Sequence, residues 1–303
     1  MILSIRLLFL GLAIRLGVGL APAAEFTDDL GRSIEVERAP MRIVSLAPAV
    51  TETVFAIGLG KRLVGVSRYC DHPPAATQLP RVGGFSDPEL EKILFLAPDA
   101  VLVTSVVQEG IHRALLGAGI KVYTVFPRSV DGLSESIRRM GTFLGAEKGA
   151  NAVAERIDLE FASVRAAVAD LPDEERVGVF FEVDPSPLVT VTSRSFEGSL
   201  IELAGGRNIA GELPKSYSRI DPEAVVLADP RVIVAAHERS LGVPHERRTG
   251  WESIDAVRGG RICADIDVDL LVRPGPRAVE GARALLFCFY PERVEAIAGA
   301  EAP

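Results

Sequence analysis

The sequence predicts an α/β protein of two lobes that are joined by one long helix. Three observations predict this architecture: β-branched runs alternate with helical stretches, an apolar stripe with helical spacing occupies the middle of the chain, and two patterns of the first half recur in the second. Such alternation is typical of α/β lobes. We place the N-terminal lobe at residues 24–145, the linker helix at 146–172 and the C-terminal lobe at 173–303.

Runs rich in Val and Ile predict the strands of buried parallel sheets. In the first half they lie at residues 42–46, 63–66, 100–103 and 121–125, with helical stretches at 51–57, 90–96 and 111–116. In the second half they lie at residues 177–181, 232–235 and 261–264. Once the first 23 residues are removed, a length of roughly 280 residues is enough for two separate cores.

The apolar stripe predicts that the linker is one continuous helix. Its members recur at spacings of 4, 4, 3, 4 and 3, which is one face of a helix: Val153, Ile157, Phe161, Val164, Val168 and Leu171. Pro172 and Asp173 then stop it. A helix of roughly six turns holds two lobes at a nearly fixed angle, whereas a Gly- or Ser-rich linker would permit large swings. We therefore expect only a small closure of the lobes.

An internal repeat supports the two-lobe interpretation. The segments 87–98 and 221–230 both begin with Asp-Pro-Glu and end at a proline before a strand, and residues 60–65 are similar to residues 206–211. Alignment of the two closing prolines sets an offset of 132 residues. The alternative is that the two segments are similar by chance, because loop–helix–strand units are common. Two matches in the same order make this alternative less attractive.

The N-terminus predicts export. Arg6 precedes an apolar run at residues 7–20, and Ala21-Pro22-Ala23 is the small-x-small pattern of a cleavage point. These features predict a signal peptide over residues 1–23 and a periplasmic protein. A membrane helix is the alternative, but Arg15 interrupts a stretch that is already short for a span. No cysteine follows the run, so the sequence offers no lipid attachment site.

The charge argues against a nucleic-acid partner. The net charge is −8, and it becomes about −10 once the two arginines of the signal peptide are removed. Nucleic-acid binding needs a basic footprint, whereas an acidic surface suits a partner that presents arginines. No second apolar stretch approaches the length of a membrane span. We expect a water-soluble monomer.

Three cysteines, Cys70, Cys263 and Cys288, give no basis for a disulfide framework. Their odd number leaves at least one thiol unpaired, and no CxxC spacing occurs.

No catalytic motif supports an enzyme. The chain lacks a GxSxG nucleophile elbow, a GxxxxGK[ST] phosphate loop, a GxGxxG fingerprint and an HExxH metal motif. The four histidines are scattered. His237 and His245 could meet on a loop, but zinc needs more convergent ligands. We expect no catalytic residue, no catalytic cofactor and no metal site. A secreted α/β enzyme remains the alternative of a different class.

Three aromatic residues are candidates for ligand contact. Loops at the carboxyl ends of parallel strands face the cleft between two such lobes. Tyr69 follows the strand at 63–66, Phe85 follows Gly83-Gly84, and Tyr217 pairs with Phe85 at the offset of 132. Aromatic rings cover large ligand faces at low entropic cost. Local core packing is the alternative for each of them.

Arg273 is a candidate polar contact of the same cleft. Arg273 lies in a rigid turn, Val-Arg-Pro-Gly-Pro-Arg at residues 272–277, which fixes the starting direction of its side chain. A planar guanidinium suits carboxylate, phosphate or amide oxygens. The alternative is a salt bridge to one of the preceding aspartates, Asp265, Asp267 and Asp269.

Glu91 and Glu223 are candidates for docking to a membrane partner. The offset of 132 pairs them, and each follows a proline in the first turn of a helix, where the helix dipole alone explains a carboxylate. A functional interpretation adds that a two-fold partner with arginine pockets could bind both. The Asp-Pro-Glu phase would instead match Glu89 with Glu223.

The chain resembles a known family. FTDDLGR at 26–32 and RIVSLAP at 42–48 with Thr51-Glu52 resemble the opening of periplasmic binding proteins for iron-siderophores, haem and cobalamin. Five further stretches resemble the cobalamin-binding branch: GVSRYCDHPP at 65–74, VGGF at 82–85, Glu91 through Pro98-Asp99, AGGRN at 204–208 and RPGPR at 273–277. The similarity extends from about Phe26 to Phe287, and the order and spacing of the stretches make it specific.

The resemblance implies a fold and a function. The fold would be two Rossmann-like lobes bridged by one long α-helix, the class III type of periplasmic binding protein. A corrinoid (cobalamin-like) ligand would lie between the lobes, and an ABC permease dimer with its ATPase would receive it. By position, ligand contact would fall on Tyr69, Phe85, Tyr217, Asp269 and Arg273, and permease docking on Glu91 and Glu223.

The chain also departs from the family pattern. Well-studied cobalamin binders have tryptophans where this chain has Phe85 and Tyr217, which leaves open another metal chelate, haem or a ferric siderophore. Ala204 replaces a family cysteine, so that cysteine's disulfide to Cys288 cannot form. Cys70 could touch a metal beside the cleft, but we expect a buried, inert thiol.

Overall fold

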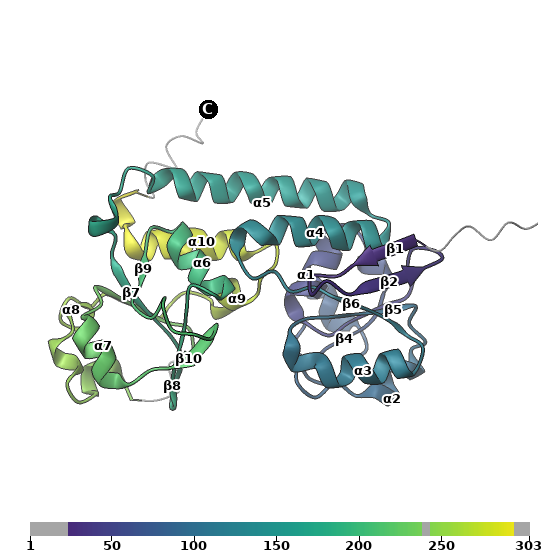
Figure 1. Ribbon diagram of the computed structural model, residues 1–303, viewed down its shortest axis with the longest axis horizontal. Coiled ribbons are helices and arrows are strands. Elements are labelled where there is room, and N and C mark those ends of the chain that lie inside the picture. The colour runs from purple at the N-terminus through teal and green to yellow at the C-terminus, as the bar shows by residue number, and fades with distance from the viewer. Residues whose placement is uncertain (1–23, 238–242, 294–303) are drawn as a thin grey trace, which may run out of the picture.

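The computed structural model describes residues 24–237 and 243–293, and it has the predicted α/β architecture. Two lobes lie below one long helix, α5 (Glu147–Ala167), which crosses the top of Figure 1. The expected signal peptide, residues 1–23, lies outside the described residues.

The N-terminal lobe is built on a parallel sheet with the strand order β4-β3-β5-β6. Its strands lie where the apolar runs predict them: β3 (Ile43–Ser45), β4 (Leu63–Val66), β5 (Ala100–Val103) and β6 (Lys121–Thr124). Its helices are α1 (Pro48–Ala56), α2 (Leu90–Phe95), α3 (Glu109–Gly117) and α4 (Val130–Leu144). An antiparallel hairpin, β1 (Ala24–Thr27) and β2 (Ser33–Val36), precedes them. All residues of β3 and β5 are buried, as continuous apolar runs require.

The C-terminal lobe contains a mixed sheet. Its parallel strands are β7 (Gly178–Pro185), β9 (Arg207–Asn208), β11 (Val232–Ala235) and β12 (Ile262–Cys263). Two further strands, β8 (Leu188–Val191) and β10 (Tyr217–Arg219), pair antiparallel on one side of β7. The helices are α6 (Phe196–Leu203), α7 (Pro222–Ala228), α8 (Asp255–Arg258), α9 (Val268–Val272) and α10 (Ala278–Phe289).

The sheets confirm the internal repeat. The parallel strands follow the order β4-β3-β5-β6 in one lobe and β9-β7-β11-β12 in the other. The offset of 132 also holds for burial and backbone: Ile93 and Val225 are both 0% exposed. Ala97 and Asp229 both adopt a positive φ, of 44° and 42°. Few non-glycine residues do so, so the match at this offset is specific.

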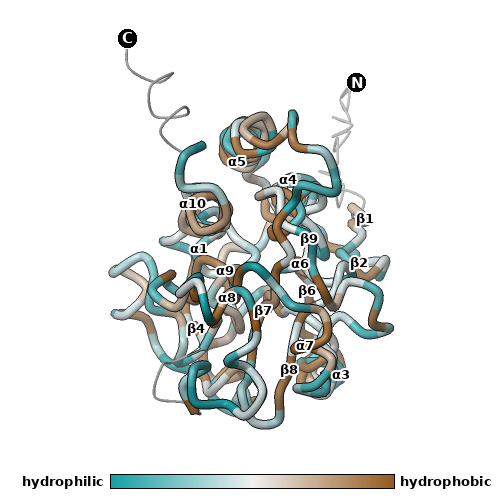
Figure 2. The backbone as a smooth tube through the Cα atoms, turned by 90° about the vertical axis from the view of Figure 1, so that its left-hand side faces the viewer, coloured by the Kyte–Doolittle hydropathy of each residue, from teal (hydrophilic) through white to brown (hydrophobic). Residues whose placement is uncertain are grey.

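The apolar stripe is buried along α5, but its last two predicted members, Val168 and Leu171, follow the end of the helix. Ile157 and Phe161 are 0% and 4% exposed, and the helix packs on α4 of one lobe and α10 of the other. Figures 1 and 2 both show α5 lying over these two helices. The helix ends at Ala167, earlier than the predicted 172, and turns cover residues 168–170. Pro172 disfavours helical backbone in Leu171, the residue before it, so a helix that reaches residue 172 is disfavoured. No described helix is both long and apolar enough to cross a membrane.

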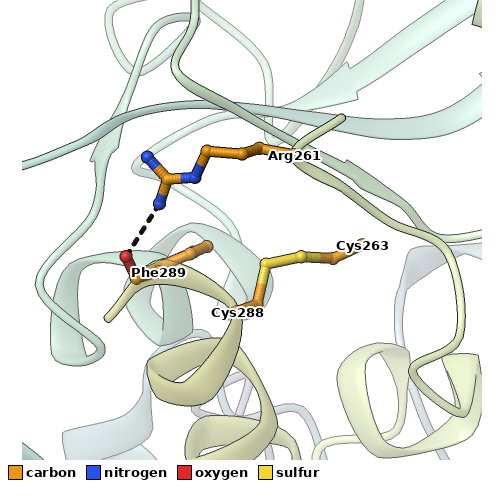
Figure 3. Close-up of a disulfide and its surroundings, with 4 residues drawn as sticks. All are labelled: Arg261, Cys263, Cys288 and Phe289. Carbon is orange, nitrogen blue, oxygen red and sulfur yellow. Dashed lines mark hydrogen bonds between the residues drawn. A yellow bond between two sulfur atoms is a disulfide. The ribbon is translucent and has the colours of Figure 1, made fainter. Parts of the chain in front are cut away.

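The structure contains a disulfide that the sequence did not indicate. Cys263 at the end of β12 is bonded to Cys288 in α10, with 6.3 Å between their Cα atoms (Figure 3). Beside it, the Arg261 guanidinium donates a 2.9 Å hydrogen bond to the Phe289 carbonyl. Cys288 therefore has a partner, although Ala204 cannot supply one. The bond closes a loop over the 25-residue separation, and this loop carries α9 and the turn with Arg273.

Candidate ligand-binding site between the lobes

The lobes touch through an ion cluster formed by loops at the carboxyl ends of their strands. Arg273, which follows α9, lies 2.6 Å from the Asp71 carboxylate in the loop after β4 and 3.2 Å from Glu52 in α1. Its other terminal nitrogen lies 2.7 Å from Asp269. Of the residues proposed for the cleft, the structure thus brings Arg273 and Asp269 together. The Asp269 contact is the salt bridge considered as the alternative from sequence.

Glu52 is the centre of this cluster. It is only 4% exposed, and Arg277 donates two hydrogen bonds of 2.9 Å to its two oxygens. The intervening Gly275 lets the turn approach α1, since a Cβ there would lie 3.1 Å from the Ala49 carbonyl oxygen. Neither the central role of Glu52 nor its partners across the lobes were predicted. The Thr51-Glu52 pair entered only as part of the resemblance.

The charges of the cluster shift one another's pKa values. The hydrogen bond from Arg273 lowers the pKa of Asp71. The hydrogen bond to Glu52 raises the pKa of Arg277. Burial raises the pKa of Asp269, although Arg273 opposes the shift. The guanidinium of Arg273 thus contacts three carboxylates, those of Glu52, Asp71 and Asp269.

Two of the three proposed aromatic rings are open to solvent, one on each lobe. Tyr69 after β4 is 52% exposed, and Tyr217 at the start of β10 is 51% exposed. Phe85 is half-buried against the main core, and the Gln108 amide donates 2.9 Å to its carbonyl oxygen. Gly83 shapes this loop, since its φ is +100° and a Cβ would lie 2.7 Å from the Asp87 carbonyl oxygen. None of the described ring contacts joins one of the three aromatics to another.

Tyr217 is fixed by a residue that the sequence did not indicate. Its hydroxyl donates a 2.7 Å hydrogen bond to Glu197 in the first turn of α6. Glu197 is 2% exposed, and burial raises its pKa. Burial and the neighbouring Glu197 also raise the pKa of Tyr217. Tyr217 therefore keeps its proton, and its ring rather than a phenolate is available to a ligand. The sequence signal that could have identified Glu197 is its position as a lone acidic residue between Phe196 and Leu200.

A second buried acid lies at the carboxyl end of the C-terminal sheet. Glu182 in β7 is 0% exposed and accepts two hydrogen bonds from Arg248, of 2.5 and 2.8 Å. His237 lies 2.6 Å and His245 3.4 Å from its oxygens. Arg248 and both histidines also line a cavity of ≈ 370 Å³. The two histidines do meet, as considered from sequence, but they meet around a carboxylate. A charged residue directly after a buried apolar run was the signal for this network.

Glu182 makes the stability of the C-terminal lobe sensitive to acid. Burial alone would raise its pKa, but Arg248 and His245 together hold the pKa at about 2, below the usual 4.5. A lowered pKa contributes stability that is present above about pH 5 and is lost as the pH falls towards 2. Glu182→Gln should lower the free energy of unfolding at pH 7 by about 3 kcal/mol, because it leaves Arg248 unpaired in a buried site. Urea unfolding at pH 7 and pH 3 measures this.

The exposed Glu246 in the same loop provides the control. Glu246→Gln should leave the unfolding free energy within about 0.5 kcal/mol of wild type. The deficit of Glu182→Gln should shrink at pH 3, because the carboxyl of the unfolded wild type is protonated there while that of the folded protein, with a pKa of about 2, still has to give up its proton. A deficit of equal size at both pH values would show that the ion pair is not its source.

Cys70 has the surroundings of a buried thiol. It is 0% exposed, the Thr51 hydroxyl donates to its sulfur at 3.1 Å, and Ser67 lies at 3.2 Å. Burial raises the pKa of the thiol, which disfavours the thiolate that a metal would need. Among residues 24–237 and 243–293, no group of three or more His, Cys, Asp or Glu could hold a metal ion.

Glu91 and Glu223 lie apart from the ion cluster, in the first turns of α2 and α7. Both are exposed, and neither has an ion-pair partner in the described part of the chain. Glu89 differs, since it forms a 2.8 Å salt bridge to Lys92. Helices α2 and α7 both lie in the lower part of Figure 1, on the side of the lobes away from α5.

Comparison with known proteins agrees with this architecture. The chain matches the periplasmic binding protein family over residues 43–266. It is 30% identical over 278 residues to the uncharacterized ABC transporter substrate-binding lipoprotein YvrC of Bacillus subtilis, a match that covers 88% of this chain and 85% of that protein.

Two crystal structures resemble the chain over most of its length. The periplasmic vitamin B12 binding protein BtuF of Vibrio cholerae has a TM-score of 0.73 and 25% identity, covering 86% of this chain and 98% of that one. A periplasmic heme binding protein from Pseudomonas aeruginosa has a TM-score of 0.71 and 28% identity, covering 84% and 94%. With two Rossmann-like lobes bridged by one helix, the class III arrangement, this chain belongs to the periplasmic binding protein family of ABC transporters.

Proposed function

We propose that the chain is a periplasmic protein that captures a corrinoid between its lobes and delivers it to an ABC permease dimer with its ATPase. The observation that carries the proposal is the pair of half-exposed rings on opposite lobes, Tyr69 two residues before Asp71 of the ion cluster and Tyr217 at the start of β10. Rings presented in this way suit the broad face of a large ligand. Phe85, Asp269 and Arg273 complete the proposed contacts.

Two features support corrinoid capture between the lobes. The vitamin B12 binding protein BtuF of Vibrio cholerae matches 86% of this chain. The hydroxyl of Tyr217 is bound to Glu197, so this ring is suited to apolar contact rather than to coordination of a metal. A polar contact from Arg273 would require its guanidinium to exchange a carboxylate of the cluster for an oxygen of the ligand.

Haem or a ferric siderophore is the second candidate. The heme binding protein of Pseudomonas aeruginosa is 28% identical to this chain, slightly more than the vitamin B12 binding protein at 25%. The half-exposed Tyr69, whose ring lies 6.0 Å from the Arg68 guanidinium, is the aromatic residue that could take a different role with such a ligand. The alternative of another class, a secreted enzyme, requires turnover of a substrate, whereas a carrier does not.

Titration of the purified protein separates these ligands. Cyanocobalamin, hemin and a ferric siderophore are each added in a calorimeter, and cyanocobalamin should bind most tightly. Tyr69→Ala should then weaken cyanocobalamin binding about tenfold or more, because burial of a large apolar side chain contributes roughly 1.5–3 kcal/mol and 1.4 kcal/mol is a factor of ten.

Phe287→Ala is the matched control, since this aromatic is 58% exposed on α10 and is not one of the proposed contacts. It should bind cyanocobalamin like the wild type. Tight binding of hemin without cyanocobalamin would replace the first candidate by the second. Absence of binding to all three ligands would overturn capture of a metal chelate.

A further inference from the structure

Two apolar side chains stand out on the described surface. Phe95 and Leu227 are each 89% exposed, whereas the other exposed large apolar residues range from 39% to 73%. Single exposed apolar residues are ordinary on protein surfaces. These two, however, occupy the same place in the two lobes, because the repeat offset of 132 pairs them.

The equivalence extends to the helices that carry them. Phe95 follows Glu91 by four residues in α2, and Leu227 follows Glu223 by four residues in α7. Residues four apart lie on the same face of a helix, with Cβ atoms about 5–6 Å apart. Each lobe thus presents a carboxylate and an apolar side chain next to each other. We call these the two docking pairs, Glu91–Phe95 and Glu223–Leu227.

The folded lobes do not need the apolar members. Ile93 and Val225 hold α2 and α7 against their sheets, and both are 0% exposed. At 89% exposure, Phe95 and Leu227 bury almost none of their surface within the chain. A polar residue would serve the fold equally well at either position. The structure therefore gives these side chains no internal role, and the helices that carry them, α2 and α7, lie on the side of the lobes away from α5 (Figure 1).

We propose that Phe95 and Leu227 are apolar anchors that insert into equivalent pockets on the two subunits of the permease, each about one helical turn from the arginine that pairs with the adjacent glutamate. The inference rests on the proposed function and adds a source of affinity to it. Exposed ion pairs contribute only about 0–1 kcal/mol each. Tight binding at an interface usually comes from buried apolar anchors, and charges mainly set encounter rate and orientation.

The chemistry of the partner follows from the duplication. The two anchors differ in shape, Phe on one lobe and Leu on the other, whereas a permease dimer presents two identical pockets. Each pocket must therefore accept either side chain, which a pocket lined by flexible apolar residues does. One arginine on each subunit completes the match to the two docking pairs.

The test measures binding to the permease–ATPase complex of the same importer, reconstituted in nanodiscs, by biolayer interferometry. Phe95→Ser and Leu227→Ser should each weaken binding about tenfold, and the double variant about a hundredfold. Leu159→Ser is the matched control, since Leu159 is 73% exposed but lies on α5. It should bind like the wild type.

Salt separates the two kinds of contact. The loss in Glu91→Gln/Glu223→Gln should diminish as NaCl rises from 0.05 to 0.5 M, about the range over which exposed charges become screened. The loss in Phe95→Ser/Leu227→Ser should persist. Wild-type binding by the apolar double variant would overturn the inference and leave the proposed function intact. Loss of cyanocobalamin affinity in that variant would also overturn it. Failure of the wild type to bind the complex would instead reject the proposed function.

Discussion

The double variant Glu91→Ala/Glu223→Ala is expected to abolish ligand uptake while the purified protein keeps its ligand affinity. Both carboxylates are exposed, and neither is paired within the described residues. Their loss should cost little stability, since a first-turn acid contributes roughly 0.3–1 kcal/mol through the helix dipole. Docking, in contrast, would lose one charge on each lobe, and interfacial charges set the encounter rate and the orientation in which the permease binds the protein. Uptake of radiolabelled cyanocobalamin by cells that express each variant is the measurement.

Glu89→Ala is the control that separates the two possible first-lobe residues. Glu89 is two positions from Glu91 and already pairs with Lys92 at 2.8 Å. The register of buried and exposed positions in α2 and α7 favours Glu91, because Ile93 matches Val225. Uptake should therefore survive Glu89→Ala. Reduced ligand affinity in the Glu91/Glu223 double variant would place these carboxylates in the binding cleft and contradict a docking role.

The parallel strands could be predicted because their signal is local. A run such as Ala100–Val103 is buried on both faces, and its burial shows in four consecutive apolar residues. The antiparallel strands β8 and β10 could not be recognised in the same way. Thr190 in β8 is 0% exposed although it is polar, and β10 has only three residues. Their pairing with the rest of the sheet, rather than their own pattern, defines them.

The contacts of the candidate site were harder to predict than its position. The turn with Arg273 could be placed at the carboxyl end of a strand, but its partners Glu52 and Asp71 lie 221 and 202 residues away along the chain. No local pattern records such distances. The pairing of Cys263 with Cys288 depends likewise on a strand and a helix that become neighbours only in the fold. A buried acid in an apolar segment is the usable signal, and it applies to Glu52, Glu182 and Glu197 alike.

Replacement of Glu52 by Gln is expected to destabilise the folded protein substantially. Glu52 is 4% exposed, and it accepts hydrogen bonds from Arg277 and Arg273 of the other lobe. Gln keeps the shape but removes the charge, so two largely buried guanidinium groups lose their shared partner. Breaking a buried ion pair from one side costs about 3–5 kcal/mol, and we expect a value near the lower end because Asp71 and Asp269 still contact Arg273. Urea unfolding at pH 7 measures this cost.

The same variant tests whether the ion cluster helps α5 to fix the angle between the lobes. Lobes held by the helix alone should widen their distance distribution once the cluster is weakened, which spin labels on exposed positions of α2 and α7 would report. Glu280→Gln is the matched control, because Glu280 is exposed in the first turn of α10 and lines the same pocket as Glu52 and Arg277. It should change neither the unfolding free energy nor the distances. If Glu52→Gln lowers the stability but leaves the distance distribution unchanged, α5 alone fixes the angle between the lobes. The helix would then hold that angle without help from the Glu52 carboxylate.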